Sequence, residues 1–288
     1  MAEVLSAERI DPSKLSKQQR EELSEKLYQI HRVVFTGLDE KEFNHYVVNS
    51  PATETRIFLY RNKQKELIGY FGVHRFEKYD EEQPLVVFRA EVGLLPGYRQ
   101  RDADLSFWLM EATKFKFLNP SKHVYFLYVP VSPSFYAMVA RYAYKVYPRY
   151  DLNIPSHSLR LMVHLAQQFG LKQAEERNPL IRKVGWITKT TDREKDYWQS
   201  SINPHIRFYI DTNPKFSEGN GLLTLIPVTI TNAVLSLFGI AFYTLKKKLR
   251  VNLTSTQSRA KVVSMPFFLF LIRVVGHAVY ALNFHSRI

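Results

Sequence analysis

The sequence of 288 residues contains no cysteine. This absence excludes disulfide frameworks, zinc sites with thiolate ligands, iron–sulfur clusters and cysteine nucleophiles. The chain also has no G-x-S-x-G elbow, no phosphate loop of the G-x-x-x-x-G-K-[ST] type, no H-E-x-x-H and no cluster of His or Asp with metal-ligand spacing. We therefore expect no metal site and no permanently bound cofactor.

Acidic residues are missing from the last quarter of the chain. Residues 219–288 contain eight Lys or Arg and no Asp or Glu, so the preceding residues carry only +5 of the net charge of +13. The basic residues lie beside long apolar runs, which favours an anionic membrane surface as partner. An evenly basic groove would favour nucleic acid, and we expect no nucleic-acid partner.

Two apolar runs flank this basic region. Residues 219–245 carry no charge, which exceeds the roughly 20 residues that a bilayer requires, although Pro227 and Asn232 interrupt them. Residues 262–284 have Arg273 at their middle, and a central Arg costs on the order of 3 kcal/mol on insertion. The second run is therefore a poor membrane span.

Topology favours an anchor that does not cross the bilayer. The loop 246–261 holds six basic residues and should stay cytoplasmic, while the amino end has Glu3, Glu8 and Asp11 in place of a secretory signal. We expect an apolar helical hairpin at 216–288, peripheral or monotopic on the cytoplasmic side of a membrane, after a domain at 1–215. A true span, and a buried core or homodimer interface, stay open as alternatives.

The first 215 residues predict an α+β fold. Apolar residues at helical spacing predict a helix over 13–35, and Asp39 followed by Glu42 predicts the capped start of a second one. β-branched and aromatic runs at 55–60, 66–76 and 85–95 predict antiparallel strands. The remaining expected elements are helices at 102–117, 133–144, 155–169 and 192–200, and strands at 123–131, 180–189 and 206–211. This order indicates a mostly antiparallel, twisted mixed sheet, with one βαβ crossover, flanked by helices.

The segment LLPGYRQRDADLSFW, residues 94–108, places a Pro, a Tyr and two Arg between a strand and a helix. It resembles the donor-binding motif of the GNAT acyltransferase superfamily, and the predicted elements of residues 15–150 follow the same order. The resemblance implies that the loop and helix amino end hold the diphosphate of coenzyme A, through amides and the helix dipole. The implied donor-binding residues are Leu94, Leu95, Tyr98, Arg99, Gln100, Arg101, Asp102, Ala103 and Asp104.

Two carboxylates distinguish this loop from the family pattern. Asp102 and Asp104 stand where the family has glycines, and carboxylates repel an anion that glycine amides would admit. One interpretation is that Asp102 caps the helix and pairs with Arg99 and Arg101 in solvent. Another is suggested by relatives that take acyl chains from acyl carrier protein and likewise lack a clean diphosphate loop.

Three residues are candidates for catalysis. Glu91 lies on the strand leading into the loop, between Ala90 and Val92, and a carboxylate among apolar neighbours suits a general base. Strand alternation could equally point Glu91 into solvent. His74, on the adjacent strand, is a second candidate base, and its neighbour Arg75 is a candidate for binding an acceptor carboxylate. The resemblance places Tyr142 as the acid that protonates the leaving thiolate, while packing is the alternative role of this tyrosine.

The sequence thus favours a GNAT-like acyltransferase at a membrane surface. It would move an acyl group from a thioester donor, either acyl-CoA or acyl carrier protein, to an amine acceptor. The alternative is a catalytically silent GNAT-fold interaction module docked on a membrane, which the two Asp residues of the loop favour.

Overall fold

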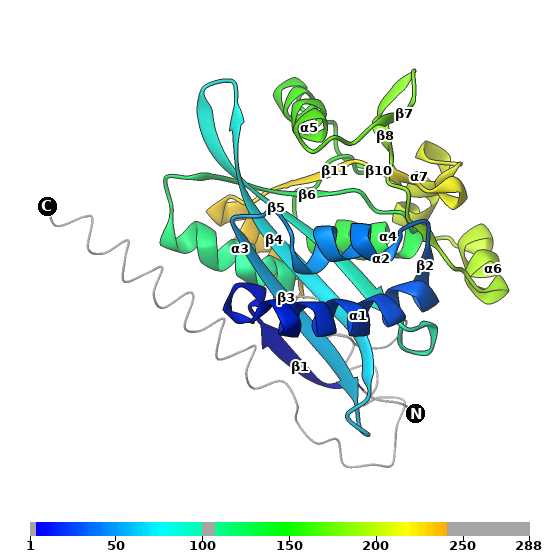
Figure 1. Cartoon of the computed structure of the whole chain (residues 1–288). Helices are drawn as coiled ribbons and strands as arrows, with labels where there is room; N and C mark the ends of the chain where they lie inside the picture. Colours follow the sequence, from blue (N-terminus) through cyan, green and yellow to red (C-terminus); the bar gives the residue numbers. More distant parts are fainter. Residues whose placement is uncertain (1–3, 100–106, 241–288) are drawn as a thin grey trace, which may run out of the picture.

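The structure is a computed structural model that describes residues 4–99 and 107–240 (Figure 1). The expected donor-loop residues Gln100, Arg101, Asp102, Ala103 and Asp104 therefore lie outside the described residues, as do residues 241–288 of the expected anchor. The two described ranges include the strand that precedes residues 100–106 and the helix that follows them.

A six-stranded sheet forms the centre of the fold (Figure 1). Its order is β1 (Val4–Ile10), β3 (Glu54–Asn62), β4 (Leu67–Asp80), β5 (Gln83–Leu94), β6 (His123–Tyr128) and β11 (Thr224–Pro227). Neighbouring strands are antiparallel except β5 and β6, which are parallel and joined by the crossover helix α3 (Phe107–Leu118). The predicted mixed, mostly antiparallel sheet with one crossover is confirmed, and β1 is a strand that the sequence analysis did not predict.

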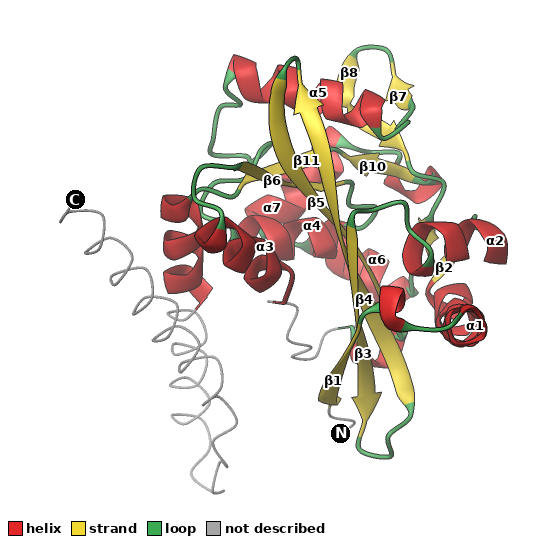
Figure 2. Cartoon of the chain, turned by 60° about the vertical axis from the view of Figure 1, so that its left-hand side comes forward, coloured by secondary structure: helices red, strands yellow, loops and turns green. Residues whose placement is uncertain are grey.

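Helices cover both faces of the sheet (Figure 2). The 3₁₀ turn η1 (Pro12–Lys14), α1 (Lys17–Val34), α2 (Glu40–Phe43) and the π-helix η2 (Asn44–Val48) lie on one side, and α3 and α4 (Pro133–Tyr142) lie on the other. Alternation along β3 supplies both cores, because Ile57 and Leu59 pack under α1 while Phe58 and Tyr60 join the cluster beneath α3 and α4.

Local capping explains where the first helices begin, at Lys17 and at Glu40. The Ser16 side chain accepts a hydrogen bond from the Gln19 backbone, and the Gln19 side chain reciprocates; Asp39 and Glu42 form the same box at α2. The turn between β4 and β5 is shorter than predicted, since residues 77–80 and 83 are extended and only Glu81 and Glu82 turn.

The chain beyond α4 adds a smaller layer. It contains α5 (Ser156–Gln168) and a sheet of β7 (Gln173–Glu175), β8 (Asn178–Lys183) and β10 (Asn220–Leu222). Its strand β9 (Ile187–Thr188) pairs with β2 (Phe35–Thr36), which follows α1. It also contains α6 (Asp192–Ser200), α7 (Pro204–Thr212) and η4 (Phe216–Glu218). The strand predicted at 206–211 is wrong: Asn203 caps α7 and Pro204 opens it, and both are typical of a helix start.

Residues 216–240, expected in the anchor segment, continue the folded domain instead. β10 and β11 belong to the two sheets, and Leu222, Leu223 and Leu225 have no exposed surface. Residues 230–240 are helical, and buried Asn232 bonds the backbone N–H and C=O of Lys145 at 2.8 and 2.9 Å. Within the two described ranges, no helix is both long enough and apolar enough to cross a membrane.

Candidate functional site

The two parallel strands at the centre of the sheet separate part of the way along. Their pairing runs from Leu85 opposite His123 to Phe88 opposite Phe126. Beyond that point β5 continues with β4 as far as Leu94, opposite Gly69, while the end of β6 pairs with β11. Residues 89–94 thus have a strand neighbour on one side only among the described residues, and the sheet opens beside them.

This open edge exposes backbone donors of β5. The amide of Leu95 donates to Ile68 on β4 at 3.0 Å. Because alternate residues of a strand direct their N–H groups to opposite neighbours, the amides of Ala90, Val92 and Leu94 point toward the side that β6 has left. They are suited to bind a carbonyl oxygen that acquires negative charge.

Glu91 and His74 form a buried pair on the face of the sheet covered by α1 and η2. His74 Nε2 lies 2.8 and 3.0 Å from the two carboxylate oxygens of Glu91, and His74 Nδ1 lies 3.0 Å from Thr55 Oγ1. Glu91 is 7% exposed and His74 is 2% exposed. Glu91 therefore points into the protein, and a proton on the Thr55–His74–Glu91 chain has a continuous hydrogen-bonded path.

Aromatic residues surround this pair. The ring centroids of Tyr46 and His74 lie 6.3 Å apart. Burial raises the pKa of the Tyr46 phenol, while the charge of Arg89 acts against this rise and that of Glu91 adds to it. Tyr70, two positions before Gly72 on the same face, bonds His31 Nδ1 at 3.1 Å, and burial lowers the pKa of His31 to about 4.

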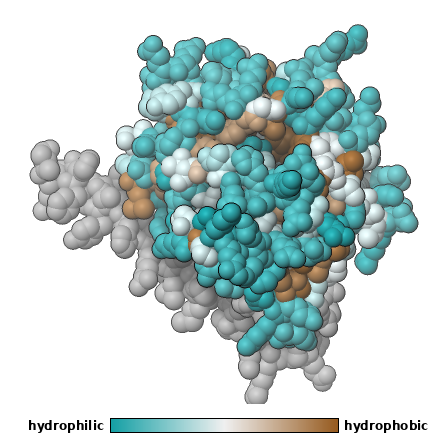
Figure 3. All heavy atoms as spheres, in the orientation of Figure 1, coloured by the Kyte–Doolittle hydropathy of each residue, from teal (hydrophilic) through white to brown (hydrophobic). Residues whose placement is uncertain are grey.

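A hydrophobic hollow crosses this side of the molecule (Figure 3). In the orientation of Figure 1 it lies between α5 and the β7–β8 hairpin above and the helices α1 and α2 below. The half-buried Tyr46 on η2 and Phe169, which follows α5, come from these two borders, and Arg89 on β5 contacts both rings. Arg89 is a functional candidate that the sequence analysis missed, although it is two residues from Glu91 and hence on the same face.

Two other depressions lie away from this region. One of about 490 Å³ is lined by residues of α1 and α2, and one of about 620 Å³ is lined mainly by the segment 197–205. Neither is lined by Glu91 or His74. With both side chains buried, the pair is accessible to a substrate only if surrounding side chains move.

The described donor-segment residues have structural contacts. Leu94 is buried and Leu95 is half-buried. The hydroxyl of Tyr98 on η3 (Pro96–Tyr98) accepts a hydrogen bond from the side-chain amide of Asn62 at 3.4 Å. Arg99 bonds Glu194 at 3.2 Å and, in addition, the carbonyls of Leu94, Lys189 and Val34 at 3.2, 3.0 and 3.4 Å. The structure thus gives Arg99 a carboxylate partner on α6, where the sequence analysis considered Asp102.

Tyr142 ends α4 and is half-buried. Glu91 bonds His74, which also lies near Thr55 of β3, the Tyr46 ring of η2 and the Phe76 ring of β4. The other tyrosine near Tyr142 on α4, Tyr136, donates to the Pro148 carbonyl at 2.8 Å and is fully buried.

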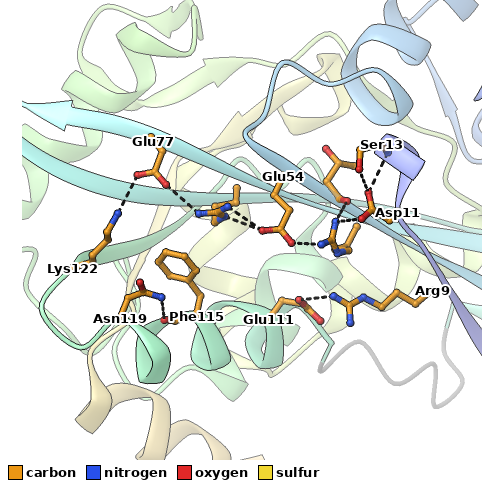
Figure 4. Close-up of polar contacts among 12 residues, drawn as sticks. Arg9, Asp11, Ser13, Glu54, Glu77, Glu111, Phe115, Asn119 and Lys122 are labelled. Carbon is orange, nitrogen blue, oxygen red and sulfur yellow. Dashed lines mark hydrogen bonds and ion pairs between the residues drawn. The ribbon is translucent and has the colours of Figure 1, made fainter. Parts of the chain in front are cut away.

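Arg75 lies on the opposite face from His74, as strand alternation requires. Its guanidinium bonds Glu54 at 3.0 Å and Glu77 at 3.1 Å and lies 4.9 Å from the centre of the Phe115 ring. Figure 4 shows these acids within a polar row that crosses the strands above α3. The row also contains Asp11, Arg56 and Lys122. Arg75 is therefore neutralised and lies on the opposite face of the sheet from Glu91, so the expected acceptor-carboxylate role does not fit it.

No metal ligand set is formed by the described residues. Among them, no three His, Asp or Glu side chains are placed to hold one ion. The described groups beside the open edge of β5 include a buried carboxylate, an imidazole and backbone amides.

Comparisons with known proteins give similarity to solved structures only. No protein-family model matches the chain, and no curated protein matches it. Arabidopsis thaliana NAA60 in complex with acetyl-CoA shares 13% identity over 77% of this chain and 99% of that chain, with a TM-score of 0.34. A GNAT-family acetyltransferase from Streptococcus pneumoniae shares 12% identity over the same shares of the two chains, with a TM-score of 0.31.

A third solved structure, from Enterococcus faecalis, is described as a probable N-acyltransferase. It shares 12% identity and a TM-score of 0.32, over 47% of this chain and 32% of that one. This chain thus matches about a third of the length of that protein. At such overlap we base the functional interpretation on the strand order and side-chain contacts of this chain.

Proposed function

We propose that the protein is an N-acyltransferase of GNAT-like fold, which moves an acyl group from a thioester to an amine. The single observation that carries the proposal is the separation of β5 from β6 beyond Phe88 and Phe126, beside the buried Glu91–His74 pair. The order of β5, which ends at Leu94, and α3, which begins at Phe107, supports the proposal through the GNAT resemblance. The donor is acyl-CoA or an acyl carrier protein.

The reaction is a direct attack of the amine on the thioester. Glu91, supported by His74, accepts a proton from the ammonium group of the acceptor, which frees the nitrogen lone pair. The nitrogen then forms a bond to the thioester carbonyl carbon, and amides of the open β5 edge stabilise the negative oxygen. The carbon–sulfur bond breaks, and the departing thiolate takes a proton from Tyr142 or from solvent.

Thiol release tests this proposal directly. The purified full chain is incubated with acetyl-CoA, longer acyl-CoA and acyl carrier protein donors plus a panel of amines, and free thiol is followed with a colorimetric reagent. The protein contributes no background because it has no cysteine. We expect Glu91→Gln to lower the rate by about 100-fold or more, while Glu25→Gln, at an exposed position on α1, retains it. Thiol release that is unchanged in Glu91→Gln, or absent with every donor, would overturn the proposal.

Two observations favour a second candidate, a catalytically silent binding module. The Glu91–His74 pair is closed to solvent, and Arg99 is already paired with Glu194. Calorimetric titration with acyl-CoA measures binding, and the thiol assay measures turnover. A silent module would bind acyl-CoA, or nothing, and would release thiol from no donor. Restoring glycine at Asp102 and Asp104 is the matched test: it changes the rate of an enzyme and leaves a silent module without turnover.

We also propose that the chain docks on an anionic membrane surface from the cytoplasmic side. The basic segment 246–261, between two apolar runs, supports this. Sedimentation with vesicles tests it: the full chain should bind vesicles with 30% phosphatidylserine and not pure phosphatidylcholine. Replacing Lys246, Lys247 and Lys248 with Gln should weaken binding about 10-fold or more, since each basic residue near such a surface contributes about 1 kcal/mol. Equal binding to both vesicle types would contradict the proposal, and light scattering without vesicles checks for a homodimer.

A further inference from the structure

Two cations lie against the ring of Phe169, which borders the hydrophobic hollow. Arg89 on β5 and Lys78 on β4 are half-buried, and both contact the ring of Phe169. Arg89 Cζ lies 4.7 Å from the ring centroid, and Lys78 Nζ lies 4.6 Å from it. Within residues 4–99 and 107–240, neither cation has an ion pair or hydrogen bond to a carboxylate.

Other arginines of the same sheet are neutralised. Arg75, one residue after the cross-strand partner of Arg89, bonds two glutamates, and Arg56 on β3 bonds Asp11 and Glu54. Among the described residues, Arg89 contacts two aromatic rings, Phe169 at 4.7 Å and Tyr46 at 5.5 Å. Aromatic faces orient a guanidinium without using its N–H donors, so those donors remain available to an anion.

The position of Arg89 on the strand identifies which anion it can meet. The donor loop begins at Leu95, six residues further along β5, and six residues of extended chain cover about 20 Å. Arg89 is therefore far from a diphosphate held at the loop. Glu91, by contrast, is the next residue but one on the same face, about 7 Å away along the strand.

We propose that Arg89, assisted by Lys78, binds a carboxylate of the acceptor, and that the acceptor is a free amino acid. This inference rests on the proposed function, because Glu91 is taken to receive the proton of the acceptor amine. A compact molecule with an amine and a carboxylate can reach from Glu91 to Arg89, and a planar guanidinium binds a carboxylate through two parallel hydrogen bonds. The apolar walls of the hollow would contact the amino acid side chain.

Binding of matched small molecules tests the proposal without any acyl donor. Alanine, alaninamide and propionate are titrated against the full chain by chemical-shift perturbation, and phenylalanine and its amide serve as the apolar pair. We expect each acid to bind about 10-fold or more tightly than its amide, as a charge-assisted hydrogen bond contributes. Propionate should bind more weakly than alanine because it lacks the amine. Equal affinity for acid and amide, or for propionate and alanine, would overturn the assignment.

Variants locate the effect. Arg89→Gln should reduce the preference for acid over amide to within about twofold, and Arg89→Lys should retain part of it because the charge remains. Lys78→Gln should reduce it less than Arg89→Gln. The matched control Arg177→Gln changes an exposed arginine in the turn between β7 and β8 and should keep the full preference. A full preference in Arg89→Gln contradicts the proposal, and circular dichroism checks that each variant folds.

The carboxylate-site proposal and the acyl-transfer proposal can each fail without the other. If no donor releases thiol but the acid preference is present and depends on Arg89, the carboxylate site stands and acyl transfer falls. If thiol is released and the ratio of KM values for alanine and alaninamide is the same in wild type and Arg89→Gln, acyl transfer stands and the carboxylate site falls.

Discussion

The carboxylate of Glu91 occupies the space directly beside Gly72, its cross-strand neighbour on β4. A Cβ at position 72 would overlap Glu91 Oε1 and approach His74 Nε2 to 3.2 Å. The absence of a side chain on β4 thus allows the acid of one strand to reach the imidazole of the next. The pair exists because three positions on two strands are complementary in size.

Gly72→Ala should therefore separate Glu91 from His74. We expect the free energy of unfolding to fall by about 1–3 kcal/mol, because the added methyl must displace a buried, hydrogen-bonded carboxylate. Urea unfolding measures this, and acyl transfer, if present, should fall with it. The matched control is Gly97→Ala for unfolding only, since nothing lies within 4 Å of a Cβ at that glycine. Equal stabilities for the two variants would mean that the Glu91 carboxylate moves away without cost.

Stability should depend on pH through His31. Burial lowers the pKa of this imidazole to about 4, whereas its pKa in an unfolded chain is about 6.5. Between these values the unfolded chain binds a proton that the folded chain does not, so stability is lost as pH falls from about 6.5 to about 4. The full loss is on the order of 3 kcal/mol.

Urea unfolding of wild type and His31→Gln at pH 7.5 and 4.5 measures this dependence. The drop between the two pH values should be smaller in His31→Gln than in wild type, because the variant has no imidazole to charge. His45→Gln, at an exposed position of η2, should show the wild-type drop. The same drop in all three proteins would show that His31 does not carry the effect.

Arg99 should stabilise the fold by linking three parts of the chain. It joins the end of β5 to the end of α1 and to Glu194 on α6. Although burial raises the pKa of Glu194, hydrogen bonds from Thr191 and Arg99 outweigh it, and the pKa lies below its usual value. Arg99→Gln and Glu194→Gln should each cost about 1–3 kcal/mol in urea unfolding, with a double variant that is less than additive.

Donor affinity distinguishes this structural role from a ligand role. If Arg99 only links these parts of the fold, Arg99→Gln and Glu194→Gln should change acyl-CoA affinity to a similar, small extent in calorimetric titration. If Arg99 is a diphosphate ligand, Glu194→Gln releases it and should strengthen binding, while Arg99→Gln weakens it. Exposed Glu25 provides the matched Glu-to-Gln control, which should leave both stability and affinity unchanged.

Asn232 should stabilise the fold despite lying in an apolar run. Its side chain bonds the N–H and C=O of Lys145 and the C=O of Pro227. Asn232→Leu should cost about 2–4 kcal/mol, since it leaves three partly buried backbone groups without their partner. Leu235→Asn, one residue before buried Ser236 but exposed itself, should cost less than about 1 kcal/mol. If residues 219–245 instead crossed a bilayer, Asn232→Leu would raise the fraction of protein that sediments with membranes. Sedimentation of the wild type and the variant measures this fraction.

Local signals predicted the parts of the fold that depend on neighbours in sequence. The capping box at Asp39 and the apolar spacing within α1 are each confined to a few residues. The run Ile206–Asp211 has the composition of a strand, yet Asn203 and Pro204 determine a helix. β1 could not be recognised, because its partner β3 lies about 50 residues away and charged residues interrupt its sequence.

The sequence predicted individual residues of the candidate site but not how the strands bring them together. Glu91 and His74 were identified individually, but which way Glu91 points depended on the register between β4 and β5, which places it beside Gly72. The same register determines which of two arginines, Arg75 or Arg89, lies on the face of Glu91. Arg75 and His74 are adjacent in sequence and lie on opposite faces, whereas Arg89 is opposite His74 and shares its face.

The position of β11 has a consequence for how the protein folds during synthesis. β6 pairs on its outer edge with residues 224–227, about 100 residues further along the chain. Until those residues leave the ribosome, an apolar strand of the central sheet presents an open edge, and such edges recruit other chains. Closure of so distant a contact is also slow. We therefore expect chains truncated before residue 224 to depend on chaperones, and full-length chains to release them.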